Sequence, residues 1–230
     1  MTEKKVALIV GGTSGLGLEI ALQLSASHEV YITGRKDPQN GLQFKFLDLG
    51  LGSFPNLGIT LQPYIRKLLT ELPLIDLLIY AAGFYQEGTL DRLDTSAIGQ
   101  MINVGLYAPT LFLQKILSMQ EHLEGFIAIT STSQWTPRKL EPVYTAVKAG
   151  LAMLANSVSL DERVGKVMVA APSGMKTKLW AGTDKDISGM LDPAVVAGDI
   201  LMHYNASPDY KYKFIKFLRE PYRQEVVEFR

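Results

Sequence analysis

The chain has 230 residues, 47% of them hydrophobic, and its 23 Lys and Arg balance its 23 Asp and Glu to a formal net charge of zero. This composition is typical of a globular domain with a sizeable core, and the charge balance predicts neither nucleic acid nor an anionic membrane as a partner. The absence of cysteine excludes disulfides and thiol catalysis, and the three histidines (His28, His122 and His203) form no metal-ligand spacing, so we expect no metal site.

Short apolar runs alternate with amphipathic helical stretches, which is typical of βαβ units around a parallel sheet. We expect strands at 5–10, 29–33, 43–47, 74–80, 125–130, 166–171 and 211–218. We expect helices at 16–25, 57–72, 95–121, 142–160 and 193–204, with Asp192 capping the last helix. The sequence therefore predicts an α/β fold, a Rossmann-like doubly wound parallel sheet of about seven strands with helices on both faces, in a single domain spanning residues 1–230.

No apolar run approaches the 18 residues that a membrane span needs, and the first run is too short for a signal peptide. We therefore expect a cytoplasmic protein with no membrane partner. The polar, glycine-punctuated segment 179–191 is expected to be a loop that covers a site.

A glycine-rich turn separates the first strand from the first helix, with the spacing Gly-x-x-x-Gly-x-Gly. Glycines let the backbone approach a pyrophosphate closely, and a helix N-terminus supplies N–H donors to it. The alternative is an ordinary strand-to-helix turn. The residues that we expect to bind a dinucleotide here are Gly11, Thr13, Ser14, Gly15, Leu16 and Gly17.

The end of the second strand indicates which dinucleotide is preferred. An acidic residue at this place binds the ribose 2′-OH of NAD, whereas an arginine pairs with the 2′-phosphate of NADP. Here Gly34 takes the expected acidic position and Arg35 and Lys36 follow it, which favours NADP(H) over NAD(H). A solvated surface pair is the alternative, and Asp37 is close enough in sequence to reach the ribose instead.

Two further strand ends carry candidate cofactor contacts. Asp48 and Leu49 follow the third strand, where Asp48 is placed to meet the adenine amino group. Ala81, Ala82 and Gly83 follow the fourth strand and are small enough to let a strand end lie against a cofactor. Simple packing is the alternative at both places. We assign residues of about 1–105 to the cofactor half and about 106–230 to the catalytic and substrate half.

Tyr144 and Lys148 are four residues apart on a predicted helix and so share one face of it. A cation held roughly 4 Å from a phenolate is worth about 4 kcal/mol at an effective dielectric near 20. That is enough to bring the pKa of a phenol toward neutrality. This pair predicts a proton-transfer role for Tyr144.

Taken together, these motifs resemble the short-chain dehydrogenase/reductase family over residues 5–180. The family's glycine motif is similar to residues 10–17, with Val10 in place of its threonine, and Asn-Asn-Ala-Gly is similar to Tyr80 through Gly83, without either asparagine. Tyr144 and Lys148 match the family's Tyr-x-x-x-Lys pair. The catalytic asparagine matches Asn103, and the catalytic serine matches Ser131, 13 residues before Tyr144.

The resemblance implies roles for these residues. Tyr144 acts as general acid or base, Ser131 holds the substrate oxygen, and Asn103 holds a water in a proton relay. Lys148 lowers the tyrosine pKa and binds the nicotinamide ribose, and Pro172 and Thr177 match the family's cofactor contacts after the sixth strand. Ser131 is also one hydroxyl among several neighbours, and a cap or bend is the alternative for Asn103.

The expected function is hydride transfer between NADP(H) and a small carbonyl or alcohol. The candidate pocket walls are mostly apolar and aromatic, without a fixed charge: Phe84, Tyr85, Gln134, Trp135, Met175, Leu179 and Trp180. The alternative is a catalytically silent NADP(H) sensor or scaffold that acts through a protein partner. The family resemblance also implies a homodimer or homotetramer, although the C-terminal segment 211–230 departs from the family pattern.

Overall fold

The computed structural model describes residues 4–38, 45–48, 57–206 and 209–230, and the predicted alternation of strands and helices is present in them. The strands are β1 (Lys5–Val10), β2 (His28–Gly34), β3 (Lys45–Asp48), β4 (Leu77–Tyr80), β5 (Leu123–Ile129), β6 (Val164–Pro172), β7 (Tyr212–Leu218) and β8 (Arg223–Phe229). The α-helices are α1 (Gly15–Leu24), α2 (Leu57–Thr70), α3 (Thr95–Ile102), α4 (Ala108–Met119), α5 (Pro142–Val158) and α6 (Pro193–Asn205). Three short helical turns complete the set, η1 (Asn103–Tyr107), η2 (Thr132–Gln134) and η3 (Lys178–Trp180).

All the described strands belong to one sheet, in the order β3-β2-β1-β4-β5-β6-β7-β8. Every neighbouring pair from β3 to β7 is parallel, and only the β7–β8 pair is antiparallel. The strand order reverses between β1 and β4, and open α/β sheets bind their ligands at the carboxyl ends of the strands beside such a reversal. The predicted Rossmann-like parallel sheet is confirmed.

Strand β8 was not predicted from the sequence, which indicates a last strand at 211–218. Its side chains are mostly exposed, because β8 lies at the edge of the sheet. The adjacent pair Val226 and Val227 also breaks the alternation of apolar and polar residues that identifies a half-buried strand.

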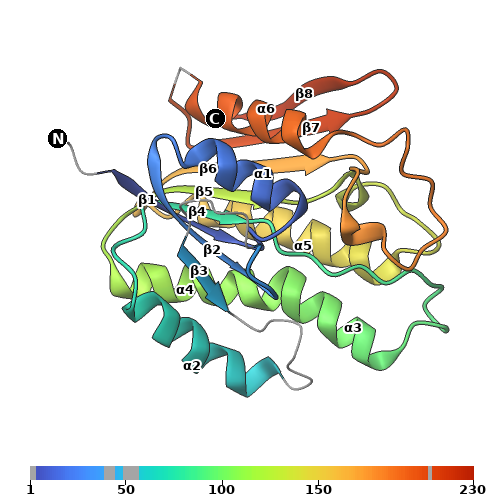
Figure 1. Cartoon of the computed structure of the whole chain (residues 1–230), viewed down its shortest axis with the longest axis horizontal. Helices are drawn as coiled ribbons and strands as arrows, with labels where there is room; N and C mark the ends of the chain where they lie inside the picture. Colours follow the sequence, from blue (N-terminus) through green and yellow to red (C-terminus); the bar gives the residue numbers. More distant parts are fainter. Residues whose placement is uncertain (1–3, 39–44, 49–56, 207–208) are drawn as a thin grey trace.

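Helices cover both faces of the sheet (Figure 1). Helices α2, α4 and α5 pack over one face, and α1 and α6 pack over the other. Successive residues of one strand pack into the cores on opposite faces of the sheet. In β1, Leu8 packs into one core and Ile9 into the other, and both side chains are fully buried. The central strands are therefore continuously apolar, as expected for a parallel sheet buried on both sides.

The predicted helix at 95–121 is continuous but not uniform. A π-helical segment, η1, separates α3 from α4, and the amide of Ala108 donates to the carbonyl of Asn103 across it. Single π-turns inside α-helices occur frequently at functional sites. The predicted cap on α6 is confirmed, because the Asp192 carboxylate accepts from the amide of Ala194 at 2.8 Å.

Tyr80 takes the place of the first family asparagine and has a contact of its own. Its side chain is fully buried at the end of β4, and its hydroxyl donates to the carbonyl of Val104 in η1. The bond joins the sheet to the π-turn that carries Asn103.

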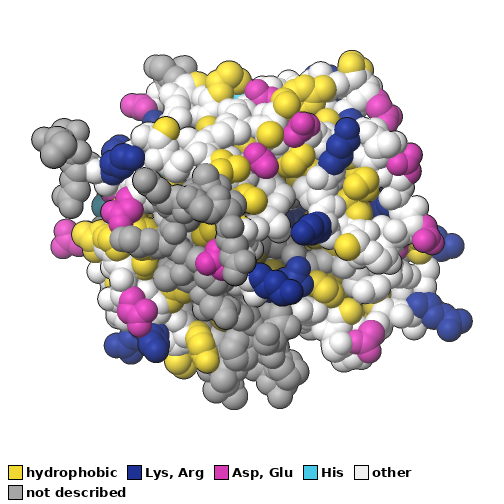
Figure 2. Space-filling model, viewed as in Figure 1, with side chains coloured by type: hydrophobic (Ala, Val, Ile, Leu, Met, Phe, Trp, Pro, Cys, Tyr) yellow, Lys and Arg dark blue, Asp and Glu magenta, His cyan; other side chains and the backbone are white. Residues whose placement is uncertain are grey.

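The described surface shows no dominant charge. Acidic and basic side chains are interspersed over the face seen in Figure 2. Among the described residues, no helix has both the length and the apolar character required to cross a bilayer. Nor does this part of the chain gather three His, Cys, Asp or Glu side chains into a group that could hold a metal ion.

We predict that Tyr80→Phe destabilises the protein, because it leaves the buried Val104 carbonyl without this donor. The expected loss is about 1–2 kcal/mol, which lowers Tm by roughly 2–8 °C in a chain of this size. Thermal unfolding by circular dichroism measures it. Tyr222→Phe is the control, because it removes a hydroxyl that donates to Asp199 at an exposed position where water can replace the lost donor. Equal Tm values for both variants would contradict the prediction.

Candidate active site

The glycine-rich turn lies directly against the end of β4. A Cβ atom on Gly11, whose φ is +87°, would lie 2.5 Å from the amide nitrogen of Ala82. A Cβ on Gly17 would lie 2.2 Å from the carbonyl oxygen of Gly11 and 3.2 Å from the Cβ of Ala81. Side chains at these two positions would therefore push the turn away from β4, and the predicted residues Gly11, Gly17, Ala81 and Ala82 form one contact.

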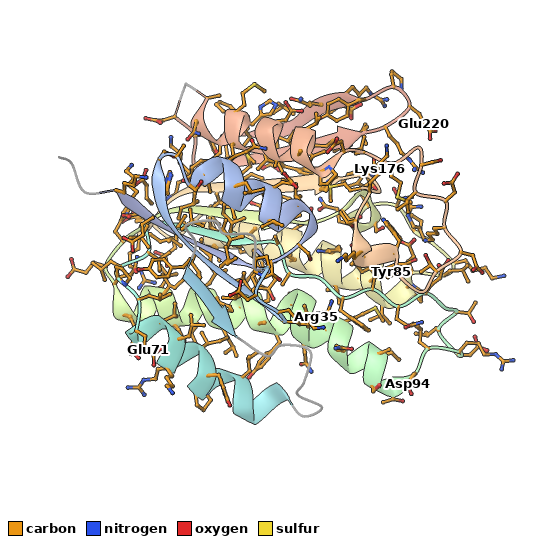
Figure 3. All side chains as sticks on the ribbon, viewed as in Figure 1. Arg35, Glu71, Tyr85, Asp94, Lys176 and Glu220 are labelled. Atoms are coloured by element: carbon orange, nitrogen blue, oxygen red, sulfur yellow. The ribbon has the colours of Figure 1, made fainter. Side chains whose placement is uncertain are left out.

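The turn also contacts the end of β2. A Cβ on Gly34 would lie 2.0 Å from the Thr13 hydroxyl, so an acidic side chain at position 34 is incompatible with this packing. Arg35 follows, exposed just beyond the end of β2 (Figure 3). Asp48 ends β3 beside Gly34. The predicted contact of the Asp48 side chain and that of Leu49 lie outside the described residues.

The start of α1 faces the segment after β6. Ser14 is the N-cap of α1, but its side chain makes no capping hydrogen bond, and Leu16 is buried in the first turn. Gly15 has a φ of +54°, and a Cβ there would lie 3.1 Å from the methyl group of Thr177. The glycine turn and Thr177 are thus adjacent, and Pro172 ends β6 just before that segment.

Ser131, Tyr144 and Lys148 meet at the end of β5 and the start of α5. The side chain of Ser131 hydrogen-bonds Tyr144, whose ring is buried. The Lys148 ammonium is buried too; it donates to the carbonyl of Ile129 at 3.0 Å and lies 5.7 Å from the Tyr144 ring centroid. A Cβ on Gly83 would lie 3.9 Å from the same nitrogen, so the end of β4 adjoins this group.

The sequence predicts that Lys148 lowers the pKa of the Tyr144 phenol, and the structure does not show this lowering. The pKa of its phenol is raised, first by burial, then by the charge of Glu141 and with a small contribution from Tyr85, whereas the Ser131 hydrogen bond lowers it. Burial lowers the pKa of Lys148 to about 8. The physical reason is desolvation, which penalises the charged form of both groups.

Asn103 begins the π-turn η1, which packs against α5. The contact is closest at Gly105, where a Cβ would lie 2.2 Å from a methyl carbon of Val147. Asn103 is therefore held near the α5 turn that carries Lys148.

Aromatic side chains surround Tyr144, as predicted. The Tyr85 and Tyr144 rings pack edge to face at 5.1 Å, Trp180 packs on Tyr85 at 5.1 Å, and Phe84 and Leu179 join this cluster. Figure 3 shows Tyr85 beside η3.

Three predicted pocket walls were not found in this cluster. Trp135 packs on Phe214 of β7 at 5.7 Å, because the turn η2 carries it toward that strand. Met175 packs against the core under α1 and α6. Gln134 ends η2 and has a buried side-chain oxygen without a hydrogen-bond partner.

The prediction of a site without fixed charge was wrong. Glu141 is buried one turn before Tyr144 and accepts from Tyr85, Ser133 and Lys185. Little in the amino-acid pattern indicates this group, because a single Glu before a helix-opening proline and a Lys in a polar loop are common surface features.

The comparisons with known proteins agree with this fold. The family model described as short chain dehydrogenase matches residues 59–188. An uncharacterized oxidoreductase, YohF, of Escherichia coli (strain K12) is 26% identical over 83% of this chain and 81% of its own length. A 3-oxoacyl-(acyl-carrier-protein) reductase, FabG, of Buchnera aphidicola is 28% identical over 78% of this chain and 73% of its own.

A solved structure shows the same architecture. An alcohol dehydrogenase from the archaeon Thermococcus sibiricus, complexed with 5-hydroxy-NADP, superimposes with a TM-score of 0.78. It is 18% identical, and the match covers 93% of this chain and 96% of that one. The fold is therefore a Rossmann-like α/β fold. Since the family model covers more than half of the 230 residues, the chain belongs to the short-chain dehydrogenase family.

We predict that Lys148→Met stabilises the ligand-free protein at pH 7. Burial lowers the Lys148 pKa from 10.5 to about 8. Between these values the unfolded chain keeps a proton that the folded chain releases, so stability rises with pH there, and below pH 8 the folded protein bears the full cost of the buried charge. That cost is up to about 3 kcal/mol, less about 1 kcal/mol for the lost hydrogen bond to Ile129.

The expected net gain is therefore about 1–2 kcal/mol, or roughly 2–8 °C in Tm. Thermal unfolding at pH 7, with Lys67→Met on exposed α2 as the matched control, measures it. A lower Tm for Lys148→Met than for the control would contradict the assigned electrostatics.

Proposed function

We propose that this protein is an NADP(H)-dependent oxidoreductase that acts on a small, mostly apolar carbonyl or alcohol. The observation that carries the proposal is the meeting of Ser131, Tyr144 and Lys148 at the end of the sheet, beside the glycine-rich turn. The 5-hydroxy-NADP bound to the Thermococcus sibiricus relative supports this cofactor class.

The residues present fit a dinucleotide. The close approach of Gly11 and Gly17 to β4 keeps side chains out of the turn, and the first N–H groups of α1 receive no side-chain cap. Such a terminus suits a pyrophosphate. We assign the holding of the cofactor to these residues: Gly11, Thr13, Ser14, Gly15, Leu16, Gly17, Arg35, Asp48, Leu49, Ala81, Ala82, Gly83, Tyr144, Lys148, Pro172 and Thr177.

Arg35 is the basis for preferring NADP(H). Its guanidinium pairs with a 2′-phosphate, and Thr13 excludes an acidic side chain from position 34. When bound, the cofactor supplies the hydride, and the protein aligns the reacting groups.

Tyr144 is the proposed proton donor. As hydride reaches the carbonyl carbon, the phenol gives its proton to the carbonyl oxygen, and Ser131 donates a hydrogen bond to the same oxygen. Since the pKa of Tyr144 is raised, the phenol is protonated at neutral pH. Lys148 holds the ribose, and Asn103 holds a water behind it.

The protein is proposed to work as a cytoplasmic homodimer or homotetramer through α3–α4 and α5. Ile102 on α3 and Met153 on α5 are exposed apolar side chains on these helices, which supports the proposal. The single domain then divides at about residue 105 into its cofactor and catalytic halves. Light scattering measures the mass, and a monomer would contradict this assembly.

We predict that Tyr144→Phe lowers NADPH-dependent turnover by about 10²–10⁴-fold, because it removes only the proton donor. Turnover is measured on a panel of aromatic and aliphatic aldehydes and ketones, and NADPH affinity by calorimetry is expected to stay within a few-fold. Wild-type protein that binds NADPH, turns over none of the panel and behaves like Tyr144→Phe would support the silent sensor instead.

We predict that Arg35→Ala weakens NADPH binding by about 10–100-fold, the value of one or two charge-assisted hydrogen bonds. NADH binding is expected to change less than about twofold, because NADH has no 2′-phosphate. Calorimetric titration with both nucleotides measures this. Arg66→Ala on exposed α2 makes the same charge change away from the site. If Arg35→Ala weakened the binding of NADPH and NADH equally, Arg35 would not discriminate between the two nucleotides, and the prediction would be wrong.

A further inference from the structure

Glu141 connects four segments around the candidate active site. Its carboxylate is 6% exposed and immediately precedes α5, three residues before Tyr144. It accepts from the Ser133 hydroxyl after β5 at 2.9 Å, from the Tyr85 hydroxyl after β4 at 3.2 Å and from the Lys185 ammonium at 3.0 Å. Arg138 lies 3.6 Å away. A buried carboxylate with these partners is a fixed centre rather than a surface charge.

We propose that Glu141 is a positioning residue of the active site, acting on Ser131 through Ser133 and on the segment after β6 through Lys185. The kinetic readouts of the test depend on the proposed function, whereas the fluorescence readout does not. The fold itself needs no carboxylate here, because the site lies at the end of the sheet and outside the two main cores.

The first contact path runs through serine hydroxyls. The Ser131 hydroxyl donates to the Ser133 hydroxyl at 3.3 Å, and Ser133 donates in turn to Glu141. The amide of Ser133 also donates to the Ser131 hydroxyl oxygen at 3.2 Å. Glu141 therefore fixes the position of the Ser131 hydroxyl through Ser133, and the single Ser131 proton turns from Ser133 to the substrate oxygen when substrate binds. Removal of the Glu141 charge disturbs this position and lowers the rate of the chemical step.

The second contact path holds the loop between β6 and α6, residues 173–192. Lys185 of this loop donates to Glu141 and to the Tyr85 hydroxyl at 2.7 Å, and its ammonium lies 5.0 Å and 4.8 Å from the Tyr85 and Trp180 rings. Trp180 is thus held against Tyr85, whose other edge meets Tyr144. Glu141 and Lys185 together keep the aromatic wall closed over the tyrosine.

The charge of Glu141 also acts on Tyr144 directly, since it raises the pKa of the phenol. The other charged and titratable groups around Tyr144 and Glu141 are Lys148, Tyr85, Arg138, Lys185 and, 3.7 Å from Lys185, Glu87. Replacing Glu141 by the uncharged glutamine therefore lowers the Tyr144 pKa.

The test uses the full chain with Trp135→Phe, which leaves Trp180 as the only tryptophan. Glu141→Gln, Ser133→Ala and Lys185→Met are made in this background. Glu124→Gln is the matched control, because Glu124 pairs with Lys5 at 2.6 Å at the amino ends of the strands, away from the site. Acrylamide quenching of Trp180 reports the loop without any need for turnover. The values of kcat and KM with NADPH and the best carbonyl of the panel are measured at pH 7.

For Glu141→Gln we expect kcat to fall roughly tenfold at unchanged NADPH affinity, and the acrylamide quenching of Trp180 to increase. Ser133→Ala is expected to lower kcat, while the acrylamide quenching of Trp180 stays the same as in the parent. Lys185→Met is expected to raise KM and the quenching constant while kcat stays within about threefold. The control is expected to match the parent in every readout.

Kinetics and Trp180 quenching of Glu141→Gln that both match the parent would overturn the proposal. If Glu141→Gln does not fold, the other two variants, Ser133→Ala and Lys185→Met, test the proposal. The proposal is overturned if the kinetics and the Trp180 quenching of both variants match those of the parent. If the parent turns over no carbonyl, the proposed function fails and quenching alone decides: an increase in Glu141→Gln and Lys185→Met supports the loop contact, and no increase overturns it.

Discussion

The structure depends on one close approach, that of the backbone after β1 to the backbone after β4. Gly11 and Gly17 have no room for a Cβ between the turn, Ala81 and Ala82. This contact holds the start of α1 at the point where the strand order reverses, and it brings the ends of β4, β5 and β6 within reach of one bound molecule. A bulky side chain at either glycine would separate the cofactor turn from the strand ends that carry the candidate catalytic residues.

Around this point the protein buries charge at the expense of stability. Lys148 is buried and donates to the carbonyl of Ile129, and burial lowers its pKa. Glu141 is also buried but has several partners, so its charge is compensated by hydrogen bonds and a lysine. Tyr144 lies between these two residues in the chain, and its pKa is raised. Its phenol is therefore in the protonated form that a proton donor needs.

Local patterns in the sequence were sufficient to predict the parallel sheet, the helices on both faces and the family, because strand periodicity, glycine spacing and the interval from Ser131 to Tyr144 are local signals. They did not predict β8, an exposed edge strand without alternation, or the π-turn at Asn103, which depends on hydrogen bonds between Asn103 and Ala108. Glu141 and Lys185 are 44 residues apart. Their pairing depends on tertiary structure and has no signature in the chain, and the same holds for the place of Trp135 on β7.

The proposed function requires that hydride passes between NADP(H) and a carbonyl at this site. NADPH that carries deuterium at the transferred position tests this, with the carbonyl panel and mass spectrometry of the products. We expect the wild-type protein to form an alcohol that carries one deuterium on its former carbonyl carbon. Saturated binding of NADPH without any deuterated alcohol from the panel would contradict it.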